Sequence, residues 1–221
     1  MWLRDARREL GLTQAKVAAR LRVSQGYLSL LESGKRTASR RLAQRLERVL
    51  HVPATALRPR DRSATDPAEL ANELATLGYE PLGYLDRNVP ANPAEVLLSA
   101  LRSGDLESRL AEALPWVPLR YPDLNWDWLL ERAKVHDVQN RLGYVVGLAR
   151  DLSERQGATA AAKLRELEAR LEPSRLAAEG TLCQDSMTQA ERKWLRENRP
   201  EPAARWNLLT NLTASDLPYA A

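Results

Sequence analysis

The amino-acid sequence predicts an all-α protein built from a small N-terminal domain and a larger C-terminal multi-helix bundle. Apolar residues recur at helical spacing along most of the chain, whereas the sequence contains no Phe and no run of more than two β-branched residues. With 221 residues, 44% of them apolar, the chain exceeds one typical domain and can bury a sizeable core. These observations favour helices packed on helices in two domains.

Residues 13–36 are expected to form two short helices joined by a tight turn. Within 13–36 the apolar positions follow helical intervals that break once, near Arg22 and Val23, so two apolar faces meet at a corner. Thr13 and Ser24 can cap the first turns of these two helices, and Gly34 suits a left-handed residue after the second.

This stretch resembles the helix-turn-helix of phage-repressor-like bacterial regulators, the Cro/C1 or XRE family. The matching residues are Leu12-Thr13-Gln14, Val17-Ala18, Val23-Ser24-Gln25, Tyr27-Leu28-Ser29 and Leu31-Glu32-Ser33-Gly34-Lys35-Arg36. The resemblance covers about residues 1–58, with a first helix implied at 2–10, a fourth at 39–50 and a short fifth at 53–57. It implies a five-helix, lambda-repressor-like DNA-binding domain whose second motif helix enters the major groove of double-stranded DNA.

The charge distribution agrees with this implication. Residues 1–62 contain 15 Lys or Arg and 5 Asp or Glu, a net charge of +10, whereas the remaining 159 residues contain 18 and 24, a net charge of −6. A basic block of this density is typical of a surface that binds a polyanion, because neutralised phosphates provide sequence-independent affinity. A solvated arginine-rich surface is the alternative interpretation.

The second motif helix begins at Ser24, and its first exposed turns are expected to face the bases. The candidate base contacts are Gln25, Gly26, Ser29 and Leu30. A glutamine amide matches the N6 and N7 groups of adenine, which makes Gln25 the strongest candidate. Leu30 is expected either to touch a thymine methyl group or to be buried. The family resemblance implies a phosphate-anchoring role for Gln14, and the full set of candidate phosphate contacts is Gln14, Ser24, Tyr27, Lys35, Arg36 and Arg40. Glu32 is interpreted as an acceptor that braces Arg36 or an amide near the turn.

A linker is expected at residues 59–66, which contain mixed charges and no apolar periodicity. Residues 67–221 are expected to form an all-α domain for dimerisation or partner binding. Its helices are predicted near 67–77, 93–103, 105–114, 125–137, 138–156, 158–172 and 188–198. Asn92, Asp105 and the Thr188–Glu191 pair are candidate N-terminal caps.

Four aromatic residues gather around three prolines in the C-terminal part. They are Trp116, Tyr121, Trp126 and Trp128, hereafter the aromatic cluster. Such a cluster suits a partner-binding surface. It equally suits a rigid corner in which the rings fill the gap between two helices, with Asn125 or Asp123 capping the second helix.

Two further segments are expected to pack closely. Gly143 and Gly147 alternate with apolar residues, which indicates a buried helix that another element approaches tightly. Trp206, Leu209 and Leu212 can dock the tail onto its own domain or across a dimer interface, whereas the last six residues can also be frayed.

The sequence offers little evidence for catalysis. His51 and His136 lie far apart and lack the spacing of metal ligands, so we expect no enzyme activity, no cofactor and no metal site. The single cysteine, Cys183, excludes an internal disulfide. No apolar run approaches about 20 residues and no signal-peptide core is present, so a cytoplasmic location is expected.

These observations predict a sequence-specific DNA-binding transcription regulator, most simply a repressor acting as a homodimer on a pseudo-palindromic operator. One alternative is an antitoxin that represses its own operon through the N-terminal domain and neutralises a toxin through the acidic C-terminal domain. Another is a DNA-linked enzyme whose active site is not recognisable from the sequence.

Overall fold

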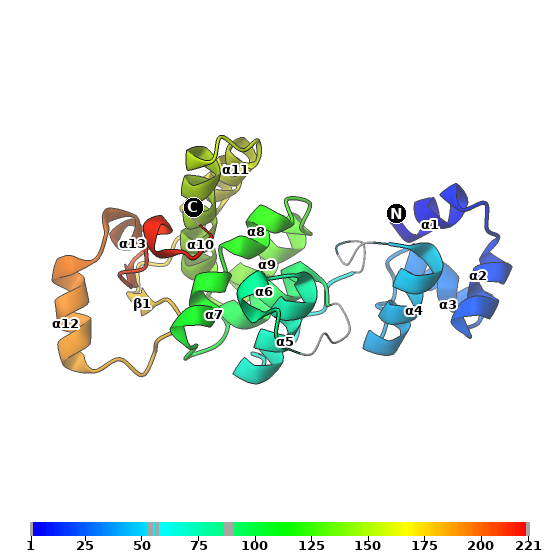
Figure 1. The fold of residues 1–221 in the computed structure, drawn as a ribbon, viewed down its shortest axis with the longest axis horizontal. Helices are drawn as coiled ribbons and strands as arrows, with labels where there is room; N and C mark the ends of the chain where they lie inside the picture. The colour runs from blue at the N-terminus through cyan, green and yellow to red at the C-terminus, as the bar shows by residue number, and fades with distance from the viewer. Residues whose placement is uncertain (1, 53–54, 56–57, 86–90, 220–221) are drawn as a thin grey trace.

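The computed structural model describes residues 2–52, 55, 58–85 and 91–219, with only the backbone of Trp2 and Arg40. The described chain is mostly helical, which confirms the all-α prediction (Figure 1). The N-terminal helices are α1 (Trp2–Glu9), α2 (Gln14–Leu21), α3 (Gln25–Glu32) and α4 (Arg40–Leu50). The short fifth helix expected at 53–57 lies, except for Thr55, outside the described residues.

The C-terminal part begins with α5 (Pro67–Leu77) and continues to the end of the chain. Its other α-helices are α6 (Pro93–Leu101), α7 (Ser108–Ala113), α8 (Trp116–Arg120), α9 (Trp126–Val135), α10 (Gln139–Arg155), α11 (Ala160–Leu171), α12 (Gln189–Asn198) and α13 (Glu201–Arg205). Among the described residues of this part, short 3₁₀ helices accompany them at η2 (Glu80–Leu82), η3 (Glu172–Ser174) and η4 (Ala214–Asp216). Strands β1 (Gly180–Thr181) and β2 (Leu208–Leu209) form one parallel pair.

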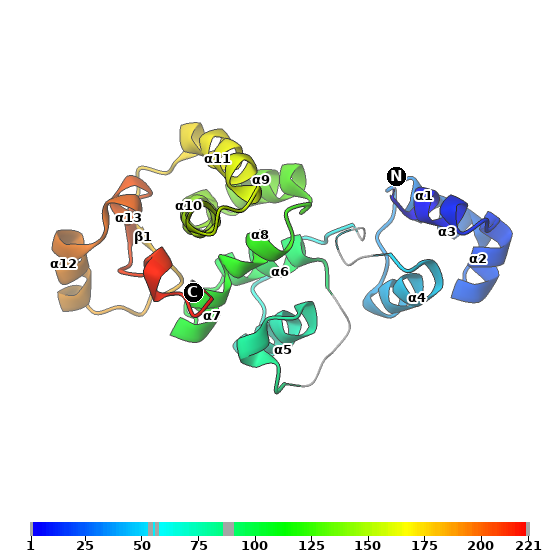
Figure 2. The same cartoon turned by 45° about the horizontal axis from the view of Figure 1, so that its top comes forward.

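The described helices pack around two separate hydrophobic cores. One consists of residues from α1 to α4 and the following Val52, and the other begins at Leu70 in α5 and extends to Leu217. In both views α1–α4 form a group of their own, joined to the remaining helices by a thin segment (Figures 1 and 2).

Local capping explains where several helices begin. The side chains of Thr13 and Ser24 accept hydrogen bonds from the amides of Lys16 and Tyr27, at 3.2 and 3.1 Å. Asn92 accepts from the amide of Ala94 at 2.9 Å. Thr188 and Glu191 form a complete capping box at the start of α12. These caps were all predicted, because each satisfies an amide that the first helical turn leaves without a partner.

The long helix α10 lies at the centre of the C-terminal part and packs most extensively against α11 (Figure 2). Trp206, which is 1% exposed, lies directly over Gly143, where a Cβ atom would be 2.4 Å from its ring. A Cβ atom at Gly147 would be 3.5 Å from Glu168. The predicted close approach to this helix is therefore confirmed, and the tail docks onto its own domain.

Some boundaries differ from those predicted. The helix expected from Asp105 begins only at Ser108, because the Asp105 carboxylate instead accepts bonds from the amide and hydroxyl of Ser186. Asn125 makes no side-chain capping bond, because its Oδ1 atom accepts from Asn92 at 2.9 Å. Helix α8 was not predicted, since its sequence contains a proline. Pro118 lies in its first turn, where no amide donor is needed.

The aromatic cluster faces the core of the C-terminal part. Trp126 is 5% exposed, and its indole NH donates to the carbonyl of Pro122 at 2.9 Å. The ring of Trp116 makes edge contacts with Tyr79 and Tyr121, with centroids 5.3 and 6.1 Å apart. Trp116, Tyr121 and Trp128 are partly buried against the core. This packing favours the structural corner over an exposed partner-binding surface.

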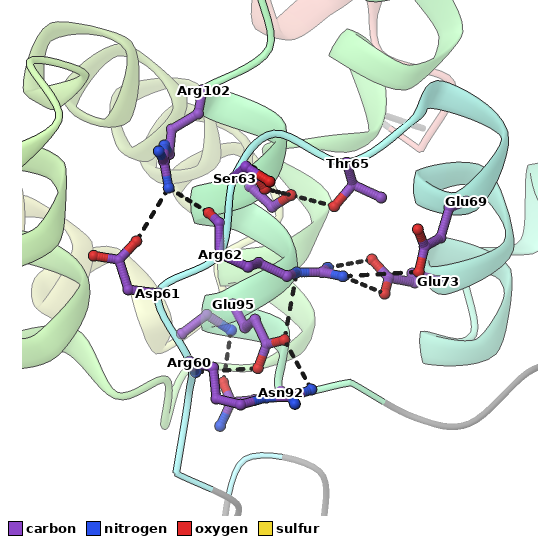
Figure 3. A network of polar contacts seen from close by, with 12 residues as sticks. Arg60, Asp61, Arg62, Ser63, Thr65, Glu69, Glu73, Asn92, Glu95 and Arg102 are labelled. Carbon is purple, nitrogen blue, oxygen red and sulfur yellow. Dashed lines mark hydrogen bonds and ion pairs between the residues drawn. The ribbon is translucent and has the colours of Figure 1, made fainter. Parts of the chain in front are cut away.

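Residues 58–66, the connecting segment, are not helical but bind the C-terminal helices (Figure 3). Arg62 contacts Glu73 at 2.9 Å and Glu95 at 3.3 Å, and the side chains of both acids are almost completely buried. A second contact joins Asp61 to Arg102, Arg132 and His136, with the Nε2 atom of His136 at 2.8 Å. Most of the expected linker is therefore held against α5, α6 and α9.

Candidate nucleic-acid interface

The α2–α3 pair presents one apolar face to the N-terminal core and one polar face to solvent. Val17, Leu21 and Leu28 are completely buried in the corner between the two helices. Arg22 adopts a left-handed conformation, with φ 54° and ψ 48°, and thereby turns the chain from α2 into α3. The polar face of α3 is left uncovered by this packing.

All four predicted base-contact residues lie on α3, and the structure leaves them accessible to different degrees. Gln25 and Gly26 are exposed, Leu30 is 37% exposed and Ser29 is half-buried. A Cβ atom at Gly26 would meet nothing within 4 Å, so the space in front of this turn is open. Leu30 is not buried, and its contact with a thymine methyl group stays a prediction.

The predicted phosphate contacts surround this face. Lys35 and Arg36 are exposed in the turn after α3. Tyr27 is half-buried, and its hydroxyl lies 3.5 Å from the carbonyl oxygen of Thr37. Ser24 uses its side-chain oxygen as the cap of α3. Arg40 begins α4, but its side chain lies outside the described part of the structure.

A chain of polar side chains connects α1 to the start of α3. The buried carboxylate of Glu32 accepts from Arg7 Nε at 2.6 Å and from Gln14 Nε2 at 2.9 Å. The Oε1 atom of Gln14 in turn lies 3.4 Å from Gln25 Nε2. Glu32 is an acceptor, as predicted, but its partners are the side chains of Arg7 and Gln14 instead of Arg36 or an amide near the turn. Sequence analysis missed Arg7 because it is 25 residues away and lies outside the motif.

The hydrogen bonds from Arg7 and Gln14 keep the carboxylate of Glu32 ionised. Burial alone would raise the pKa of the carboxyl group. The hydrogen bonds from Arg7 and Gln14, together with the charges of Arg7 and Arg4, outweigh burial and hold the pKa below its usual value. A negative charge at this position fixes the Gln14 amide in one orientation, because Glu32 accepts only from its NH₂ group.

The orientation of Gln14 also determines which groups of Gln25 are available. A glutamine amide has two N–H donors and one oxygen acceptor. Gln25 directs one donor to Gln14, which leaves one donor and its oxygen for a ligand. Adenine presents one acceptor, N7, and one donor, the N6 amino group, in the major groove. The free groups of Gln25 match this pair.

Comparison with known proteins agrees with the geometry of the N-terminal domain. A family model described as Helix-turn-helix matches residues 3–57. The match confirms that this segment is a helix-turn-helix of the Cro/C1 (XRE) type, and it supports a DNA-binding transcription regulator. No curated protein and no solved structure matches the chain.

The C-terminal part offers no comparable site among the residues described. No group of three or more His, Cys, Asp or Glu side chains in the described ranges is arranged to hold a metal ion. His136 contacts Asp61, whereas His51 is exposed at the end of α4. None of the helices described here combines the length and apolar character that crossing a bilayer requires.

Proposed function

We propose, from the XRE helix-turn-helix of residues 3–57, that the protein is a sequence-specific repressor that reads DNA with α3. The exposed amide of Gln25, oriented by Gln14 and Glu32, is the observation that carries this proposal. Around it, Lys35 and Arg36 are exposed for phosphate contacts that set the register on the duplex.

The experiment that tests base reading is the replacement Gln25→Ala. Preferred duplexes are first selected from a random pool with the full-length protein, and affinities are then measured on a selected and a scrambled duplex. We expect a loss of about 1–3 kcal/mol, roughly 5- to 150-fold, on the selected duplex and almost none on the scrambled one. Gln189→Ala, at an exposed position of α12, is the matched control. Equal losses on both duplexes would remove Gln25 from the reading role.

We further propose that the repressor acts as a homodimer on a pseudo-palindromic operator. One helix-turn-helix contacts one half-site, and a two-fold dimer doubles the number of base contacts. The C-terminal part is the proposed source of the dimer interface, because its core is the larger of the two. Sedimentation of the full-length protein, alone and with a selected duplex, measures this directly. A single protomer on each palindromic duplex would contradict it.

The sequence predicts that residues 59–66 are a linker. The packing of the connecting segment favours a different boundary between the two domains. The main-chain amide of Arg60 donates to Glu95 at 3.1 Å, and Arg62 lies between Glu73 and Glu95. On the other side, the guanidinium of Arg58 lies near Gly34, where a Cβ atom would be 3.8 Å away. We therefore propose that the C-terminal domain begins at Arg60.

An antitoxin is the second candidate function. The charge of −6 over residues 63–221 favours a basic protein partner for the C-terminal domain. Affinity capture with the full-length protein from its native host would recover a protein encoded beside this gene. Recovery of the protein itself alone would favour the homodimeric repressor.

A further inference from the structure

A second basic surface lies on the N-terminal domain, apart from the predicted DNA contacts. It is a groove of about 590 Å³ between the C-terminal end of α2 and α4. Its polar lining consists of Arg20, Arg22, Arg41, Gln44, Arg45 and Arg48. No acidic residue lines this groove, hereafter the basic groove, among the residues that the structure describes.

The sequence of α4 explains the groove. Arg41, Arg45 and Arg48 follow one another at helical spacing, on the side of α4 that its buried leucines do not occupy. Arg45 donates to the carbonyl of Leu21 at 2.8 Å, which satisfies an acceptor at the end of α2 and holds the two helices together. The groove is therefore a fixed feature of the packing between α2 and α4.

The other four arginines are not used by the fold. Arg20, Arg22, Arg41 and Arg48 are exposed, and within the described part of the chain none makes a side-chain hydrogen bond or an ion pair. Elsewhere in the molecule many arginines contact carboxylates, as Arg62 does. Several unpaired positive charges around one groove repel one another, and a bound anion would relieve this repulsion.

Arg22 provides an independent observation. Its φ of 54° is a left-handed conformation that glycine adopts without strain and that other residues adopt at a cost. The strained residue lines the groove and its side chain is exposed. Arg22 ends α2 in this conformation, as His51 ends α4, so the helix end explains the backbone, and the groove has an exposed arginine at a position that glycine would occupy without strain.

We propose that the basic groove binds the phosphate backbone of DNA as a second contact surface, separate from α3. Guanidinium groups suit this ligand because each can bind a phosphate through two parallel hydrogen bonds. Gln14 begins α2 and Arg22 follows its end, so the two surfaces are about 12 Å apart along this helix at 1.5 Å per residue. The phosphates belong either to the flank of the duplex that α3 binds or to a second duplex.

The double variant Arg41→Gln/Arg48→Gln tests the proposal in the full-length protein. Both residues are exposed and neither supports the fold. Binding to a long random-sequence duplex is measured at increasing salt. The logarithm of the binding constant decreases with the logarithm of the salt concentration. We expect the steepness of this decrease, the salt slope, to become smaller by about 0.9 for each lost phosphate contact, and thus by about 1.8 in the double variant. Arg155→Gln/Lys163→Gln, which removes two exposed charges from α10 and α11, should leave the slope unchanged. An unchanged slope in the groove variant would overturn the proposal.

Two arms distinguish the sources of phosphate. If the groove binds the flank of the duplex that α3 binds, the variant loses affinity for long duplexes but not for a short duplex that contains only the base pairs contacted by α3. If it binds a second duplex, the variant loses the ability to capture a labelled duplex when already bound to an immobilised one. An effect on sedimentation of the protein alone, with no change in either arm, would indicate a protein ligand and overturn the proposal.

Arg22→Gly gives a sharper test, because we expect it to stabilise the fold while it weakens the binding of DNA. Relief of the left-handed strain should raise the melting temperature, while loss of a phosphate contact should lower the salt slope by about 0.9. A higher melting temperature with an unchanged slope would exclude Arg22 from the contact. The test is independent of base reading, since groove variants weaken all sequences equally whereas Gln25→Ala affects only selected duplexes.

Discussion

The contact between Gly143 and Trp206 makes a severe test of how α10 is packed. A Cβ atom at Gly143 would lie 2.4 Å from Cη2 of Trp206 and 2.5 Å from two further ring carbons. Carbon atoms pack at about 3.5–4.0 Å, so Gly143→Ala places a methyl group roughly 1 Å too close. The ring is 1% exposed and enclosed by the core, so it has no free space into which to move.

The magnitude follows from two opposing effects. Inserting a methyl group into a filled core costs about 1–3 kcal/mol. Replacing glycine by alanine inside a helix gains about 0.5–1 kcal/mol. Because three ring carbons are displaced together, we expect the cost at its upper end and a net loss near 2 kcal/mol, or roughly 4–8 °C in melting temperature for a chain of this size.

Gly147→Ala, one helical turn further on, is the matched control. Its Cβ atom would lie 3.5 Å from Glu168 Oε1, an ordinary contact distance, so we expect a gain of about 0.5–1 kcal/mol. Urea unfolding followed by circular dichroism measures both variants. Equal stability of the two variants would refute the reasoning, as would a failure of Trp206→Leu to relieve part of the cost in the double variant.

Three further predictions concern buried ionisable groups. Arg62→Met removes the guanidinium that contacts two buried carboxylates, so urea unfolding should show a loss of about 3 kcal/mol, whereas Arg60→Met, at a side chain that is 42% exposed, should cost under about 1 kcal/mol. Glu32 has a lowered pKa in the folded state, so its stabilisation should be present above its ordinary pKa and disappear as the pH falls through the folded value; Glu32→Gln should lower stability at pH 7 and make its decline on acidification less steep in an unfolding series. Burial raises the pKa of Cys183 to about 11, so native protein should resist alkylation at pH 8 until urea unfolds it, and rapid labelling without urea would contradict the buried position.

Local signals in the sequence were sufficient for most of the helices and for several of their caps, but not for α8 or for the helix starts expected at Asp105 and Asn125. Thr13, Ser24 and Thr188 each bond to an amide three residues ahead, so spacing alone predicts them. The exposed face of α3 followed from the same helical periodicity.

Contacts between distant residues were not predictable in this way. The pairing of Arg7 with Glu32 joins residues 25 apart, and β1 pairs with a strand 28 residues later. Arg62 lies in a stretch whose mixed charges indicate a linker. Only the folded position of Glu73 and Glu95 shows that it is bound.

The attachment of the connecting segment limits how the N-terminal helices can move relative to the C-terminal helices. The guanidinium of the exposed Arg58 lies near Gly34, and the main-chain amide of Arg60 donates to Glu95, so few residues separate the N-terminal helices from the first contact with the C-terminal helices. In the dimer proposed above, held by the C-terminal domains, a short connection would restrict the distance and angle between the two copies of α3. Adding a base pair between half-sites rotates one half-site by about 34° around the duplex at 10.5 bp per turn. A flexible tether would absorb this rotation, whereas in the proposed dimer a short joint would make binding depend on the spacing of the two half-sites as well as on their base sequence.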